Sequence, residues 1–140
     1  MTGISLGGLG ALLSARDQAA SVDGLVLLSP YVGNDATLFK EIEVAGGPAA
    51  WAINRSALRE KVDREVWTFL GQHASDLPPT WLLFGAEDYL RAGQRLLAGL
   101  LPSTRVTVMS GAHNWTTWER LWRNVCTSSD VFAAEKRPPP

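Results

Sequence analysis

The chain has 140 residues, enough for one domain, and its 46% hydrophobic and 19% charged residues are typical of a globular protein. Fourteen acidic and thirteen basic side chains give a formal net charge of −1, which favours neither nucleic acid nor an anionic membrane as a partner. The sequence has no apolar run near the ~20 residues that a membrane-spanning helix needs. A single cysteine cannot form an internal disulfide, so we expect a reducing, cytoplasmic location.

Helix and strand patterns alternate along the chain. The predicted elements, in chain order, are a helix (6–15), a strand (24–29), a helix (58–70), a strand (81–85), a helix (90–101), a strand (106–109) and a helix (115–125). The first two strands are short continuous apolar runs, as in strands buried on both faces of a parallel sheet. Residues 34–52 are expected to be irregular. The alternation predicts an α/β fold with a three-stranded parallel sheet flanked by helices.

The first motif is the stretch Gly3-Ile4-Ser5-Leu6-Gly7, which fits the pattern G-x-S-x-G. In this pattern Ser5 would lie on a sharp turn between a strand and a helix, with its hydroxyl clear of the sheet. The motif glycines are expected to avoid clashes in the turn, and Gly8 and Gly10 to let the helix pack close to the sheet. The N–H of Leu6 is then a candidate oxyanion donor. The structural alternative is a serine that caps the helix.

Two later residues could activate this serine. A serine hydroxyl becomes a nucleophile when a histidine removes its proton and an acid orients that histidine. Asp88 follows the second predicted strand, and His113 follows the third in a loop that contains glycine. Asp35, after the first strand, is an alternative acid, and Asp88 could instead cap the next helix. The order along the chain predicts a catalytic triad of Ser5, Asp88 and His113.

Three tryptophans fall at helical spacing in the last predicted helix, namely Trp115, Trp118 and Trp122. They are predicted to form the face of that helix that packs on the sheet. Trp115 is also a candidate wall of the substrate pocket, because it lies two residues after the predicted catalytic histidine. The other histidine, His73, is expected to face solvent. With two histidines, one cysteine and no short-spaced ligand partners, we expect no metal site.

Three stretches together resemble α/β-hydrolases: residues 3–8, the run Gly85-Ala86-Glu87-Asp88, and the run Gly111-Ala112-His113-Asn114-Trp115-Thr116-Thr117-Trp118. The G-x-H-x-W-x-x-W pattern of the last run is similar to the esterase-D-like branch of serine esterases. The resemblance covers about residues 1–126 and implies a partial α/β-hydrolase fold, with strands 6–8 of the family. It also implies hydrolysis of small-molecule carboxylic esters or thioesters through an acyl-enzyme, without a cofactor.

The chain departs from this family at its N-terminal side. Five earlier strands and the loop that supplies the second oxyanion donor are missing, and only Met1 and Thr2 precede the motif. We therefore expect an N-terminally truncated α/β-hydrolase; a lost segment could have carried a signal sequence. Its sheet would have an unpaired edge, available for pairing with another chain. Two alternative functions stay open: a weak or inactive fragment that lacks the second oxyanion donor, and an acyltransferase.

The resemblance also suggests how the chain is divided. The hydrolase domain is predicted over 1–132, followed by a disordered tail at 133–140. The insert at 34–77 lies where the family places a lid. Phe39 and Trp51 within it are candidate apolar contacts for the substrate.

Overall fold

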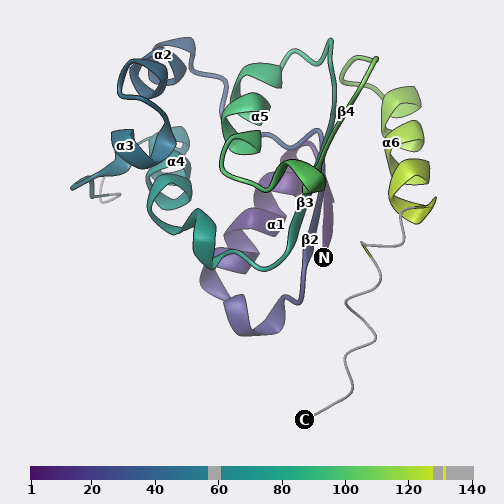
Figure 1. Ribbon diagram of the computed structural model, residues 1–140, viewed down its shortest axis with the longest axis horizontal. Helices are drawn as coiled ribbons and strands as arrows, with labels where there is room; N and C mark the ends of the chain where they lie inside the picture. Colours follow the sequence, from purple (N-terminus) through teal and green to yellow (C-terminus); the bar gives the residue numbers. More distant parts are fainter. Residues whose placement is uncertain (57–60, 128–130, 132–140) are drawn as a thin grey trace.

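The computed structural model describes residues 1–56, 61–127 and 131, and its centre is a parallel sheet (Figure 1). Within these residues the sheet has four strands in the order β1-β2-β3-β4: β1 Thr2–Ile4, β2 Leu25–Leu28, β3 Thr80–Gly85 and β4 Val106–Met109. All neighbouring pairs are parallel. The predicted α/β class with a parallel sheet flanked by helices is therefore confirmed. The tail expected at 133–140 lies outside the described residues.

The predicted count of three strands is wrong, because Thr2–Ile4 forms a fourth strand ahead of the serine motif. The Val26 N–H donates to the Met1 carbonyl at 2.9 Å, and the Ser5 N–H donates to the Leu28 carbonyl at 3.0 Å. Three residues before a glycine-rich turn are too few to show a strand pattern in the sequence. The pairing with β2 defines them instead. β1 and β4 are the two edges of the described sheet.

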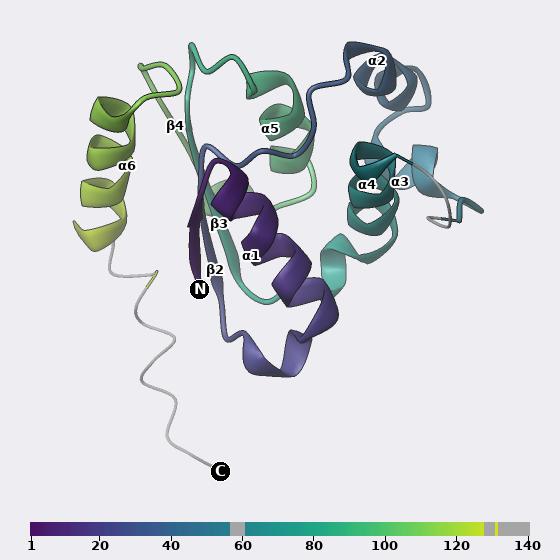
Figure 2. The same ribbon diagram turned by 180° about the vertical axis from the view of Figure 1, so that it is seen from behind.

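Helices cover both faces of this sheet. The α-helices are α1 Leu6–Asp17, α2 Ala36–Val44, α3 Pro48–Ala52, α4 Val62–His73, α5 Arg91–Ala98 and α6 Trp115–Thr127, and the short 3-10 helices are η1 Ala19–Ser21, η2 Ala74–Asp76 and η3 Ser103–Arg105. The first five α-helices lie on one face and α6 on the other (Figures 1 and 2). Because the strands follow one another in a single direction, right-handed crossovers place every connecting helix on the same face. No helix in the described part of the chain is long and apolar enough to span a bilayer.

The apolar side chains of the sheet separate into two clusters, one under each helical layer. Leu27 and Leu82 belong to the larger cluster, together with α1 and the α2–α4 group. Val26 and Leu83 belong to the smaller cluster, together with α6. Successive strand residues point to opposite faces, so continuous apolar runs are needed when both faces are covered. The two apolar runs at β2 and β3 thus predicted the buried centre of the sheet.

Residues 34–52 are helical rather than irregular, which corrects the prediction. α2 begins after Asp35, whose carboxylate accepts hydrogen bonds from the N–H groups two and three residues later, at 2.9 and 3.2 Å. Gly46 and Gly47, with φ values of 94° and 117°, separate α2 from α3. Pro48 then opens α3, at a helix start where its fixed φ is favourable and its missing N–H costs nothing. The run Gly46-Gly47-Pro48 interrupts the helical structure, as expected, but it lies between two short helices and not within an irregular segment.

Phe39 and Trp51, predicted as apolar contacts for the substrate, are buried side chains of the larger core cluster. The Phe39 side chain is 7% exposed, and its ring packs edge-on against Trp67 with 6.1 Å between centroids. Trp51 is 5% exposed, and the Arg55 guanidinium lies 4.0 Å from its ring centroid. Both rings belong to the larger core cluster. Their burial stabilises the α2–α4 group against α1 and the sheet.

Of the three tryptophans of α6, only Trp118 packs against the core: it is partly buried beside the smaller cluster, whereas the fully buried face of the helix is made by other residues. That face is made by Thr117, Leu121 and Val125, which are spaced four residues apart. Trp115 is 64% exposed and Trp122 is 40% exposed. Spacings of three and four residues occur in neighbouring stripes of the same helix, so periodicity alone does not select the stripe that meets the sheet.

Candidate active site

Ser5 lies on a sharp turn between β1 and α1, with φ 52° and ψ −119°. A positive φ is costly for a residue with a side chain, so the surrounding structure must hold this turn in place. Gly3 makes the turn possible, because a Cβ on it would lie 2.2 Å from the carbonyl oxygen of Gly7. Gly7 and Gly10 face open space and have no such steric role. The predicted avoidance of clashes in the turn therefore holds for Gly3 and not for Gly7, and the predicted close packing of the helix does not involve Gly10.

The turn after β2 holds the backbone of Ser5 from two sides. The Leu28 carbonyl accepts from the Ser5 N–H at 3.0 Å, and the Tyr31 N–H donates to the Ser5 carbonyl at 2.8 Å. Gly8 lets α1 approach this turn, since a Cβ there would lie 2.6 Å from the Cβ of Pro30. These contacts fix the strained serine relative to the carboxyl end of the sheet.

Ser5, His113 and Asp88 form one hydrogen-bonded line, as the sequence predicted for their placement. The Ser5 hydroxyl lies 2.9 Å from His113 Nε2. His113 Nδ1 lies 3.0 and 2.9 Å from the two carboxylate oxygens of Asp88. The three residues follow β1, β4 and β3, and parallel strands bring their carboxyl ends to one edge of the sheet. Residues 108 positions apart therefore meet within hydrogen-bond distance.

The Asp88 carboxylate is fully buried, with 0% of the residue exposed. Besides His113, it accepts a hydrogen bond from the Leu90 N–H at 2.8 Å on Oδ1 and from Gln94 Nε2 at 3.3 Å on Oδ2. The alternative interpretation, that Asp88 caps the next helix, is wrong, because the N-cap of α5 is Leu90 and the Asp88 side chain bonds to the Leu90 N–H ahead of that helix. A buried carboxylate needs such donors because it has lost its water. Asp88 is held to present Oδ2 and Oδ1 to the imidazole.

The loop that carries His113 is packed tightly on the loop that carries Asp88. A Cβ on Gly85 would lie 2.0 Å from the Gly111 carbonyl oxygen, and the Glu87 carboxylate accepts a hydrogen bond from the Gly111 N–H. Gly111 itself has φ 143°, which favours glycine. Asn114 then caps α6, since its side-chain oxygen accepts from the Thr117 N–H at 3.0 Å. His113 is therefore placed by hydrogen bonds between side chains and backbone on both sides of it.

Two aromatic rings contact the imidazole of His113. Tyr89 lies at 4.8 Å and Trp118 at 5.0 Å between ring centroids, both edge-on. These rings restrict rotation of the imidazole, whose side chain is 9% exposed. Trp118 belongs to the G-x-H-x-W-x-x-W run, so a sequence signal existed for it. Tyr89 gave no signal beyond its place next to Asp88.

An apolar cavity of about 370 Å³ lies beside the triad, between the β1 edge of the sheet and α6. It is lined by Thr2, Ile4, Leu28, Trp115, Trp118, Glu119 and Trp122. Two lining residues are neighbours of the hydrogen-bonded line: Ile4 directly precedes Ser5, and the Trp118 ring contacts His113. Trp115, predicted as a candidate pocket wall, is among the lining residues. Phe39 and Trp51 are not.

Asp35, the alternative acid, is not part of the triad geometry. Its carboxylate is engaged at the start of α2, as described above, and the His113 imidazole is already paired with Asp88. The loop that leads to α2 is itself fastened to α4: the Tyr31 hydroxyl donates to Asp63 at 3.3 Å. Burial, and then the nearby Asp63 carboxylate, raise the pKa of Tyr31. The structure therefore favours Asp88 as the acid.

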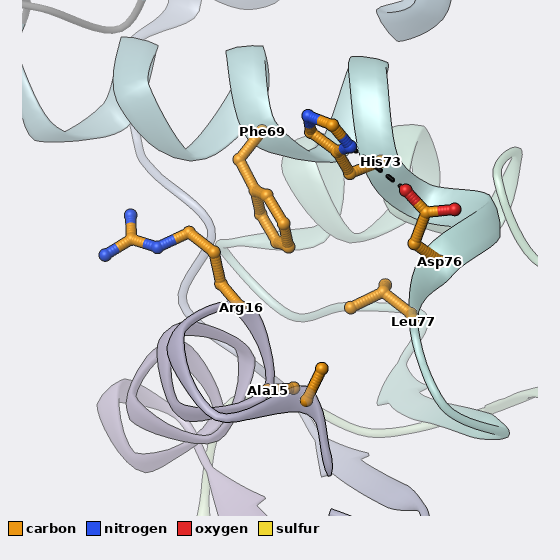
Figure 3. A pocket seen from close by; sticks show the side chains of 7 residues that line it. Ala15, Arg16, Phe69, His73, Asp76 and Leu77 are labelled. Carbon is orange, nitrogen blue, oxygen red and sulfur yellow. Dashed lines mark hydrogen bonds and ion pairs between the residues drawn. The ribbon is translucent and has the colours of Figure 1, made fainter.

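His73 lies at the far end of α1 from the triad, beside a second cavity of about 340 Å³ (Figure 3). Its Nδ1 lies 3.0 Å from Asp76, and its side chain is 53% exposed. Figure 3 shows this pair across the cavity from Arg16 and Ala15 of α1, with Phe69 and Leu77 between them. Because α1 has 12 residues, its two ends are ~18 Å apart. The pair is too far from Ser5 to act on it.

The Leu6 N–H is the predicted oxyanion donor. Leu6 is the first residue of α1, so no carbonyl within the helix can accept from its N–H. In the described part of the chain, no three histidine, cysteine, aspartate or glutamate side chains are grouped so that they could hold a metal ion. The arrangement can therefore supply a nucleophile, a base, an orienting acid and one backbone donor.

Comparisons with known proteins give little further information. No protein-family model matches the sequence, and no curated protein matches it. Among solved structures, the chain is similar to a monoacylglycerol lipase from Paleococcus ferrophilus, with 20% sequence identity and a TM-score of 0.41. The match covers 79% of this chain and 57% of the lipase chain, so the chain spans little more than half of that protein. Values at this level do not establish a family.

Proposed function

We propose that the chain is a serine hydrolase of the α/β-hydrolase type that cleaves carboxylic esters or thioesters through an acyl-enzyme. The observation that carries the proposal is the unbroken hydrogen-bonded line from Ser5 through His113 to a fully buried Asp88. The strained turn at Ser5 supports it further, because strain of this kind is expected where a side chain must be presented for chemistry.

The first half of the proposed reaction forms the acyl-enzyme. The Ser5 oxygen attacks the carbonyl carbon of the ester while His113 Nε2 takes the serine proton. The electron pair of the carbonyl moves onto its oxygen, next to the Leu6 N–H. Asp88 accepts from His113 Nδ1 and so favours the tautomer whose Nε2 lone pair faces Ser5. The tetrahedral intermediate then expels the alcohol or thiol, which takes the proton from Nε2.

The second half releases the acid. Water gives its proton to His113 Nε2 and attacks the acyl carbon, and the new intermediate collapses with return of the proton to Ser5. A second alcohol or thiol could take the place of water, which would make the protein an acyltransferase. Both outcomes need the same acyl-enzyme, and only the competition between water and an added acceptor separates them.

The apolar cavity beside the triad supports an apolar group in the substrate. Its lining contains three tryptophans, an isoleucine and a leucine, with Glu119 as its one charged side chain. Removal of an apolar chain from water favours binding by about 25 cal/mol per Å² of buried surface. A carboxylate at the cavity would disfavour a substrate group of negative charge. We therefore propose uncharged acyl or alcohol groups as the preferred occupants.

The rate depends on how the oxyanion is stabilised. Loss of one donor from an oxyanion hole typically costs about 10²–10³ in turnover. Leu6 is the one donor that we assign, so the alternative of a weak or inactive hydrolase stays a separate proposal. It predicts that the serine is placed correctly but reacts slowly.

The test is covalent labelling of the purified chain with a fluorescent fluorophosphonate, which reacts with activated serines. We expect labelling that Ser5→Ala abolishes, that His113→Gln strongly reduces, and that the matched control Ser21→Ala leaves unchanged, because Ser21 is exposed in η1. Labelling followed by turnover of a short-chain nitrophenyl ester supports the hydrolase. Labelling without turnover supports the weak fragment. A folded chain that is not labelled refutes both.

A further inference from the structure

Gln94 is a fully buried polar residue on α5, 0% exposed, with no place in the mechanism above. Its Nε2 lies 3.3 Å from Asp88 Oδ2 and 3.3 Å from the carbonyl oxygen of Pro30. We propose that Gln94 is a positioning residue, which fixes the Asp88 carboxylate and ties it to the turn that holds Ser5. The inference rests on the proposed function, since it assigns a role within the same triad.

Within the part of the chain that the structure describes, three hydrogen-bond donors surround the Asp88 carboxylate. On Oδ1 the carboxylate accepts from the Leu90 N–H at 2.8 Å, and on Oδ2 from Gln94 at 3.3 Å. His113 Nδ1 contacts both oxygens. Two donors that do not take part in the reaction thus hold the two oxygens separately. Without Gln94, the carboxylate plane would be fixed only by Leu90 and by the imidazole that it is meant to orient.

The same amide nitrogen also donates a hydrogen bond to the Pro30 carbonyl. Pro30 lies in the turn whose neighbours, Leu28 and Tyr31, bond to the Ser5 backbone. Pro30 also meets α1 at Gly8. One Nε2 group therefore bridges the acid after β3 and the turn after β2. A shift of either loop would be resisted by this bridge, so the distance between the acid and the serine turn is defined.

The side-chain amide of Gln94 also lowers the stability of the fold. Gln94 Oε1 is buried without a hydrogen-bond partner among the described residues. An unpaired buried oxygen is unfavourable, and a methionine of the same length would avoid that cost. A side chain that only filled space here would therefore be better as an apolar residue. The donor bonds of Nε2 are what an apolar residue would lose.

The first experiment tests the contact without any activity measurement. In the ¹⁵N-labelled chain, NMR would follow the side-chain amides of Gln94 and of Gln72, which lies on α4 and bonds to the carbonyls of Ala52 and Arg55. Asp88→Asn is expected to move the Gln94 side-chain resonance and to leave that of Gln72 in place. A Gln94 resonance that Asp88→Asn does not move overturns the proposal, whether or not Ser5 reacts.

The second experiment tests positioning with Gln94→Met, which keeps length and removes the donor. The control is Leu97→Met, a buried change one turn along α5. We expect Gln94→Met to stay folded in the absence of denaturant, to shift or broaden the downfield proton resonance of the Asp88–His113 hydrogen bond, and to slow fluorophosphonate labelling about tenfold or more. If Gln94→Met keeps the proton resonance and the labelling rate of the parent chain, as Leu97→Met is expected to do, the positioning role of Gln94 is refuted. If the parent chain is not labelled, the proposed function fails. The Gln94 side-chain resonance and the proton resonance of the Asp88–His113 hydrogen bond then decide alone whether Gln94 positions Asp88.

Discussion

The glycines around Ser5 allow a sharp test of the turn geometry. A Cβ added at Gly3 would lie 2.2, 2.5 and 2.7 Å from three backbone atoms of Gly7 and Gly8, so no side chain can rotate away to relieve the overlap. Overpacking typically costs 1–3 kcal/mol, and a clash with backbone should reach about 3 kcal/mol. At Gly7 and Gly10 the added Cβ meets nothing within 4 Å. There, inside α1, alanine should stabilise by about 0.5–1 kcal/mol through its helix preference.

The assay is equilibrium unfolding in urea, followed by tryptophan fluorescence, together with fluorophosphonate labelling. Gly3→Ala should lower the free energy of unfolding by about 3 kcal/mol and reduce labelling, because relief of the clash must displace the serine turn. Gly10→Ala should raise the unfolding midpoint and leave labelling unchanged, and Gly7→Ala should also raise the midpoint. The reasoning fails if Gly3→Ala is as stable as Gly10→Ala, or if Gly7→Ala is as harmful as Gly3→Ala.

Three further predictions concern the acid, the cavity and an ion pair. Asp88→Asn should reduce fluorophosphonate labelling by orders of magnitude, whereas Asp35→Ala should cost about 0.5–2 kcal/mol in urea unfolding without altering the labelling rate; equal labelling by the two would contradict the assignment of the acid. Trp115→Ala should change stability by less than about 0.5 kcal/mol, because the ring is mostly exposed, yet raise KM for long apolar esters more than for acetyl esters in steady-state assays. The Arg64 side chain, by its hydrogen bonds, lowers the pKa of Glu41. Glu41→Gln should therefore lower the free energy of unfolding at neutral pH, and this difference from the parent should disappear as pH falls through the lowered pKa of Glu41. A difference in urea midpoint that persists at lower pH would refute this.

The sequence alone was sufficient for the class of fold and for the expectation that Ser5, Asp88 and His113 lie close together. The apolar runs at β2 and β3 indicated strands buried on both faces, and the helices between them indicated a parallel sheet. Asp88 and His113 each follow a predicted strand, and Ser5 lies in the G-x-S-x-G motif, so the sequence predicted that the three side chains meet at one edge of the sheet. These inferences succeed because strand periodicity and loop position are local properties of the chain.

Other features were decided by tertiary structure. β1 is a strand only because its backbone pairs with β2, and three residues carry no pattern of their own. Phe39 and Trp115 have similar apolar character, yet one is in the core and the other lines the cavity, since that depends on which neighbours pack against α2 and α6. Gln94 carried no motif at all.

The sequence by itself determined which chemistry-bearing residues are present, their order and the alternation of helix and strand. The tertiary structure decided that Asp88 rather than Asp35 meets His113, that Gly3 and not Gly7 shapes the turn, and that Gln94 meets the Asp88 carboxylate. Each of these depends on distances of about 2–4 Å between groups on separate elements. Such distances are set by how the strands and helices pack together, and no local pattern records them.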